Sequence, residues 1–75
     1  MNNTMNSKRL QELRKEAGMQ QSELAKEAGL SESMISKLER GTANISVTNM
    51  KEIVQILATR LARPVNTVLI ELVYQ

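Results

Sequence analysis

Residues 21–41 read QSELAKEAGLSESMISKLERG, and this stretch decides the fold class. Gly29 and Gly41 each follow a run of apolar residues at helical spacing, where glycine ends a helix in a left-handed conformation at least steric cost. Leu30 and Ile35 flank the start of the second run at the spacing of a hydrophobic staple, in which the residue before the helix packs on its fourth residue. The stretch therefore predicts two short helices joined by a tight turn.

The staple spacing recurs along the whole chain. An apolar residue, a polar residue able to cap a helix and, after three more residues, a second apolar residue occur five times, at Met5-Asn6…Leu10, Met19-Gln20…Leu24, Leu30-Ser31…Ile35, Ile45-Ser46…Met50 and Val65-Asn66…Ile70. Gly18 follows the first run, and Pro64 falls between the last two, where it interrupts no helix interior. We therefore expect an all-α fold, a compact bundle of five helices with short loops and no strand.

Length and composition limit the function classes. The 75 residues suffice for one domain, assigned to 1–75. A domain of this size has a thin core, and dimerisation would add to the apolar surface that it buries. The chain has no Cys and no His, which excludes disulfides, the usual zinc sites and thiol or imidazole catalysis, so we predict no cofactor and no metal. No apolar run approaches the roughly 18 residues of a membrane helix. A soluble protein of the cytoplasm and nucleoid, without membrane contact, is expected.

Charge and aromatic content bear on the partner. Ten Lys and Arg against eight acidic residues give a net charge of +2, a weak indication of an anionic partner that an ordinary solvated surface explains better. The single aromatic residue, Tyr74, argues against RNA and single-stranded nucleic acid, which proteins hold by stacking on aromatic or Arg side chains. If the partner is a nucleic acid, we expect duplex DNA.

The helix predicted after Gly29 has two different faces. On a helical wheel at about 100° per residue, short or charged side chains share an arc of roughly 140°; they are Glu32, Ser33, Ser36, Lys37 and Arg40. The opposite side carries Met34, Ile35 and Leu38. Short hydrogen-bonding side chains suit close approach to base edges in a major groove. The competing interpretation is an ordinary exposed helix face.

From Gln21 to Arg40 the chain resembles the helix-turn-helix of phage Cro and repressor proteins, the Cro/C1-type or Xre-like family. The matching positions are a close helix contact, the turn glycine and the shared core, at Ala25, Gly29, Leu24, Ala28, Leu30, Ile35 and Leu38. The resemblance extends from Leu10 to about Leu57 and implies a lambda-repressor-like DNA-binding domain with its helix-turn-helix at 21–40. The layout is also similar to controller proteins of restriction–modification systems.

The resemblance implies roles for individual residues. Base edges would be contacted by Glu32, Ser33, Ser36 and Lys37. DNA phosphates would be contacted by Gln21, at the start of the first of the two helices, and by Arg40, Thr42 and Asn44. Arg14 and Glu39 would form a buried or half-buried ion pair that connects the first helix to the end of the helix predicted after Gly29, the recognition helix. The alternatives are solvated surface residues and, for the pair, two unrelated surface charges.

Two positions depart from the family pattern. Gln20 stands where relatives cap the helix with Ser or Thr, and Glu23 in the first turn partly offsets this. Glu32 stands where relatives often carry glutamine. Its carboxylate either accepts from cytosine N4 or discourages non-specific binding by repelling phosphates. Lys37 is a donor for guanine O6 and N7, unless it is simply a solvated lysine.

Beyond Ala58 the resemblance loosens, and the last segment, NTVLIELVYQ, carries more apolar residues than one buried stripe needs. We expect a C-terminal helix at about 66–74 that mediates homodimerisation through Val68, Leu69, Leu72 and Val73. Alternatively, all of them pack on the chain's own core, or the segment adds a strand. A two-fold dimer would place two recognition helices in major grooves about 34 Å apart, on an inverted-repeat operator.

The sequence thus predicts a homodimeric, sequence-specific DNA-binding transcriptional regulator, a repressor or autoregulator. We predict no enzymatic activity, because no general acid with a base and no nucleophile with a base can be named. The competing hypothesis is a protein-interaction module, such as an antitoxin that binds a partner protein through its C-terminal helix. The oligomeric state of the isolated chain distinguishes the two hypotheses.

Overall fold

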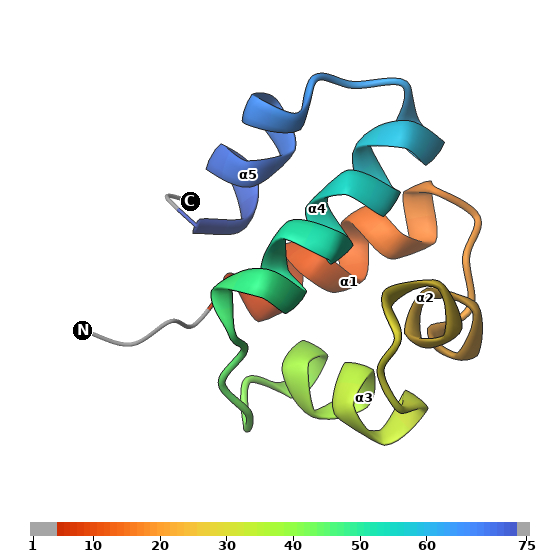
Figure 1. Cartoon of the computed structure of the whole chain (residues 1–75), viewed down its shortest axis with the longest axis vertical. Helices are drawn as coiled ribbons and strands as arrows, with labels where there is room; N and C mark the ends of the chain where they lie inside the picture. The colour runs from red at the N-terminus through yellow and green to blue at the C-terminus, as the bar shows by residue number, and fades with distance from the viewer. Residues whose placement is uncertain (1–4, 74–75) are drawn as a thin grey trace.

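The computed structural model describes residues 5–73, which form five α-helices (Figure 1). The helices are α1 (Ser7–Glu16), α2 (Gln21–Ala28), α3 (Glu32–Arg40), α4 (Val47–Leu61) and α5 (Val65–Val73). The described residues contain no strand. The expected all-α, five-helix fold is confirmed, while residue 74 of the expected last helix and residues 1–4 of the expected domain lie outside the described part.

Polar caps define where the first four helices begin. Asn6, Ser31 and Ser46 have extended backbones, and each side chain accepts a hydrogen bond of 3.0–3.1 Å from the main-chain N–H three residues later. At the start of α2, the Glu23 carboxylate accepts from the main-chain N–H of Gln20 at 3.1 Å. Each cap satisfies a donor that the helix itself leaves without a partner.

The start of α5 corrects the sequence analysis. α5 begins at Val65, and the main-chain N–H of Val68 donates to the carbonyl of Pro64 at 3.3 Å. Pro64 therefore precedes the helix, and Asn66, the expected cap, lies inside the first turn. Proline suits this place because its fixed φ is close to helical and it has no N–H to leave unsatisfied. Val65 and Ile70 both lie within α5, five residues apart, so they do not hold the positions of the expected staple; their side chains are 39% and 47% exposed.

Left-handed residues end the helices. Gly29 has φ +71° in the turn between α2 and α3, and Gly41 has φ +76° after α3. At Gly41 a Cβ would also lie 3.1 Å from the Oγ of Ser7, so the first turn of α1 packs closely on the end of α3. α4 is followed by Ala62 with φ +54°, the one non-glycine residue with positive φ between residues 5 and 73.

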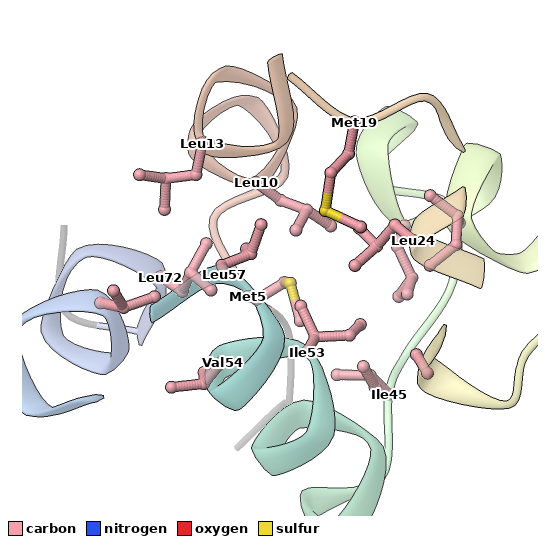
Figure 2. Packing of buried hydrophobic residues seen from close by; sticks show 14 of the residues in the cluster. Met5, Leu10, Leu13, Met19, Leu24, Ile45, Ile53, Val54, Leu57 and Leu72 are labelled. Carbon is pink, nitrogen blue, oxygen red and sulfur yellow. The ribbon is translucent and has the colours of Figure 1, made fainter. Parts of the chain in front are cut away.

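A single hydrophobic core joins the helices (Figure 2). Leu10 of α1 and Leu57 of α4 are 0% exposed at its centre. Met5, Met19 and Ile45, which lie outside the helices, are also buried, so the core holds the loops in place. α5 packs on α1 and α4, on the side away from α2 and α3 (Figure 1). None of the described helices is both long and apolar enough to cross a membrane.

Candidate nucleic-acid interface

The α2–turn–α3 unit has a fixed geometry. α2 ends at Ala28 and is followed by the left-handed Gly29. The main-chain N–H of Leu30 then donates back to the carbonyl of Ala25 at 2.8 Å and closes the end of the helix. Ala25 and Ile35 are buried, at 2% and 0% exposure. Because the turn is hydrogen-bonded and both helices reach the core, α3 has a defined direction relative to α2.

The polar face of α3 is uncovered. Four of its residues are exposed and Ser36 is half-buried; the exposed ones are Glu32, Ser33, Lys37 and Arg40. Within residues 5–73, none of these five side chains takes part in an ion pair. The structure therefore brings the four expected base-contacting residues onto one accessible helix face, beside Arg40.

Arginine and lysine have different environments in this protein. Four arginines pair with glutamates between residues 5 and 73, namely Arg9, Arg14, Arg60 and Arg63. Six exposed cations pair with none of the described residues; they are Lys8, Lys15, Lys26, Lys37, Lys51 and Arg40. Five glutamates are paired, which leaves Glu23, Glu32 and Glu52 (8 − 5 = 3). Unpaired cations thus outnumber unpaired carboxylates by six to three.

A buried polar network joins α1 to the end of α3. The Nε and Nη2 groups of Arg14 donate to the Glu39 carboxylate at 2.6 and 3.1 Å, and Nη1 donates to the carbonyl of Met19 at 2.8 Å. Arg14 and Glu39 are each 8% exposed. The ion pair implied by the resemblance is present and buried, and its additional hydrogen bonds offset the cost of removing two charges from water.

Sequence reasoning missed the third side chain of this network. Gln21 Nε2 donates to Glu39 Oε1 at 3.0 Å, across 18 residues of sequence. A carboxylate only accepts, so the amide nitrogen of Gln21, and not its oxygen, faces Glu39. The amide keeps a second N–H, so this bond is compatible with a phosphate contact. No local sequence pattern predicts such a bond, because it depends on how α2 and α3 are packed.

The loop after α3 presents its polar residues unequally. The Thr42 hydroxyl donates to the carbonyl of Lys37 at 3.3 Å, and the Thr42 main-chain N–H donates to the same oxygen at 2.9 Å. The hydroxyl hydrogen is therefore used in ending α3 and is not available for a phosphate in this conformation. Asn44 and Arg40 are exposed and retain their side-chain donors.

The four residues expected at a dimer interface separate into two pairs. Val68 and Leu72 are 0% exposed, so the expectation that they face a partner is wrong. They form the stripe of α5 that is buried against the core, because residues four apart lie on one face of a helix. Leu69 and Val73 are 36% and 38% exposed and remain available.

An apolar groove between α4 and α5 adjoins these exposed residues. It is lined by Lys51, Val54, Gln55, Val65 and Leu69. Val47, at the start of α4, is 57% exposed. Sequence analysis missed the contribution of α4 to this surface, which depends on the packing of α5 against α4. In the described residues, no group of His, Cys, Asp and Glu could hold a metal ion.

Two short helices joined by a left-handed glycine, the second with an uncovered polar face, define a helix-turn-helix protein. The model of the helix-turn-helix family HTH_3 matches residues 10–63. The chain therefore belongs to this family, the Cro/C1-type helix-turn-helix proteins, and the expected membership is confirmed.

Two solved structures are similar to the chain. The clp gene regulator ClgR from Corynebacterium glutamicum has a TM-score of 0.72 and 29% identity over 87% of this chain, which covers 65% of the ClgR chain. The restriction-modification controller protein C.AhdI from Aeromonas hydrophila has a TM-score of 0.63 and 35% identity, over 83% of this chain and 84% of its own. No curated protein matches the chain in sequence.

Proposed function

We propose that the protein is a sequence-specific regulator of transcription that binds double-stranded DNA through α3. The uncovered polar face of α3 carries this proposal. An α-helix fits the major groove of B-DNA, and short side chains such as Ser33 and Ser36 let its backbone approach base edges closely. The helix-turn-helix of residues 21–40 and the helix that follows Pro64 act within a single domain, residues 1–75. The two similar structures are a gene regulator and a controller protein.

Base recognition is assigned to Glu32, Ser33 and Lys37, which are exposed, and to the half-buried Ser36. Lys37, in the last turn of α3, donates to guanine O6 and N7. Glu32, in the first turn, accepts from cytosine N4 or repels phosphates at incorrect sites. Ser33 and Ser36 donate to or accept from neighbouring bases.

Phosphate binding is assigned to groups that border α3. The main-chain N–H groups at the start of α2 and the second N–H of Gln21 are donors for one phosphate. Arg40 and Asn44 are donors for phosphates on the other side of α3, and Thr42 contributes there only after its hydroxyl leaves the Lys37 carbonyl. The surplus of unpaired cations supports an anionic partner, and it predicts binding that weakens as salt rises.

The protein acts as a homodimer that represses or autoregulates transcription in the cytoplasm, on an inverted-repeat operator. Leu69, Val73 and the neighbouring groove offer apolar area that a second copy of the chain would cover, which a small domain needs more than a large one. A two-fold dimer places the two α3 helices in successive major grooves about 34 Å apart. An antitoxin-like module would use the same surface for a different protein, and self-association of the isolated chain distinguishes the two.

Fluorescence anisotropy tests DNA binding directly. Labelled duplexes that tile the DNA upstream of the gene are titrated with the protein, with excess random duplex present, at two salt concentrations. We expect tight binding to one inverted repeat, and an affinity that falls as salt increases. Weak binding that is equal for all duplexes would contradict an autoregulatory role and direct the search to a partner protein.

A further inference from the structure

One main-chain hydrogen bond connects the two ends of the described chain. The N–H of Asn6 donates to the carbonyl of Leu72, in the last turn of α5, at 2.6 Å. The other main-chain bonds of loops and caps between residues 5 and 73 join residues at most five positions apart. Asn6 therefore connects the start of α1 to the end of α5.

Both groups in this bond lack a partner within a helix. Asn6 precedes α1, so its N–H is not used by that helix, and the carbonyls of the last turn of α5 have no helical donor. Asn6 is itself held, because its side chain accepts from the Arg9 main-chain N–H at 3.0 Å and Met5 before it is 5% exposed. The anchor for α5 is therefore a fixed point on α1.

Ion pairs lie beside this anchor. Glu71 of α5 pairs with Arg9 of α1, and Arg63 Nη1 lies 3.8 Å from the other Glu71 oxygen. Hydrogen bonds from Arg9 to Glu71 and then Glu12 raise the pKa of Arg9 above its ordinary value. The flank of α5 toward α1 is thus polar and bonded, while Leu69 lies on the flank that lines the groove with α4.

We propose that Asn6 is a positioning residue for self-association, because its main-chain N–H fixes the last turn of α5. This inference rests on the proposed homodimer. Leu72 directly precedes Val73 and lies three residues after Leu69, so the turn that carries the exposed apolar residues is the turn that Asn6 holds. Without this bond the last turn of the helix frays. The turn must then be ordered when two copies associate, and the entropy lost in that step weakens the dimer.

Two substitutions at Asn6 separate its main-chain contact from its side-chain cap. Asn6→Ala removes the cap of α1 and keeps the N–H, whereas Asn6→Pro removes both and places the proline Cδ against the Leu72 carbonyl, which lies 2.6 Å from the nitrogen. The φ of Asn6 is −67°, which proline adopts without change. The readouts are the dimer dissociation constant from sedimentation velocity over a dilution series, and the unfolding midpoint of each variant. Both variants are compared at a temperature where circular dichroism shows them folded.

We expect Asn6→Pro to raise the dimer dissociation constant by at least about 3- to 10-fold above that of Asn6→Ala, because it removes one hydrogen bond and its Cδ also displaces the Leu72 carbonyl. Hydrogen exchange provides a second measurement, made on the wild-type protein and on both variants. The Asn6 amide should exchange slowly, and the amides of residues 69–73 should exchange faster in Asn6→Pro than in Asn6→Ala.

Equal dissociation constants for the two variants, or rapid exchange of the Asn6 amide in the wild-type protein, would overturn the positioning role and leave the homodimer intact. A wild-type protein that sediments as a monomer at every concentration would overturn both the homodimer and the inference. The two failures are therefore distinguishable in the same series of sedimentation experiments.

Discussion

Glu39, in the last turn of α3, is held by Arg14 of α1 through two hydrogen bonds of 2.6 and 3.1 Å. The Arg14 side chain is 9% exposed and the Glu39 side chain 2%, whereas every other ion pair between residues 5 and 73 has side chains that are 16–49% exposed. The direction of the proposed recognition helix thus depends on a contact that lies behind its DNA-facing side. Substitutions should separate this structural role from the proposed roles in binding.

Removing one side of the buried pair should destabilise the fold strongly. We expect Arg14→Met to lower the free energy of unfolding by about 3–5 kcal/mol, because Glu39 then remains buried without a cation. Arg60→Met is the matched control, since the Arg60–Glu27 pair is about 40% exposed on each side chain; such pairs contribute about 0–1 kcal/mol. Urea unfolding followed by circular dichroism measures both. Equal losses would contradict a special role for the buried pair.

Gln21→Glu should make stability depend on pH. The new carboxylate would lie within hydrogen-bond distance of Glu39, and two like charges there disfavour ionisation in the folded state. The variant should therefore be least stable near neutral pH and recover relative to the wild type as pH falls toward about 4, where a shared proton links the carboxyls. Gln21→Ala is the control and should lose about 1 kcal/mol at every pH. A pH-independent loss in Gln21→Glu would argue against the observed contact.

Lys37→Ala and Gln21→Ala should affect DNA binding in different ways. Lys37→Ala removes the proposed base contact, so the affinity for the cognate site should fall by about 1–3 kcal/mol while binding to random duplex changes little. Gln21→Ala removes the proposed phosphate contact and should weaken binding to both duplexes alike. Competition anisotropy with the two duplexes measures the ratio. If Lys37→Ala lost affinity equally for both duplexes, Lys37 would not contribute to sequence specificity and the proposed base contact would be wrong.

Dimerisation should depend on one flank of α5. Leu69→Lys places a charge on the exposed apolar surface and should shift the protein toward monomer, with little change in the unfolding free energy measured at concentrations where both proteins are monomeric. Thr67→Lys is the control, because Thr67 is exposed on the side of the same helix away from Leu69 and Val73, and it should leave the oligomeric state unchanged. Leu72→Ala should instead lower stability by about 2–5 kcal/mol, because it opens a cavity in the core. Sedimentation velocity and urea unfolding together separate these effects.

Substitutions at the left-handed residues that follow α4 and α2 should change stability in opposite directions. Ala62→Gly should stabilise the protein by about 1 kcal/mol, because a left-handed residue with a Cβ carries a cost of about 1–2 kcal/mol that glycine avoids, less its greater freedom when unfolded. Gly29→Ala should destabilise it by about 1 kcal/mol for the same reason. Thermal unfolding of both variants checks the pair. A loss of stability in both variants would mean that, at Ala62, the greater freedom of glycine in the unfolded chain outweighs the relief of the left-handed conformation.

The sequence by itself determined the number of helices and nearly all of their ends. Asn6, Ser31 and Ser46 cap helices because a side chain bonds to an N–H only three residues away, and Gly29 ends α2 because only its own φ matters. It also determined the polar face of α3, since a face follows from the helical period alone. These features are local, so the order of residues is enough to predict them.

Only the tertiary structure decided which groups meet across the chain. Gln21 bonds to Glu39 over 18 residues, and the Asn6 N–H reaches the carbonyl of a residue far along the chain in α5. The periodicity of α5 marks it as apolar on more than one side, but the packing against α1 and α4 buries Val68 and leaves Leu69 exposed. The physical reason is that a pattern fixes the polarity of each helix face, whereas the neighbour that covers the face depends on how all the helices pack together.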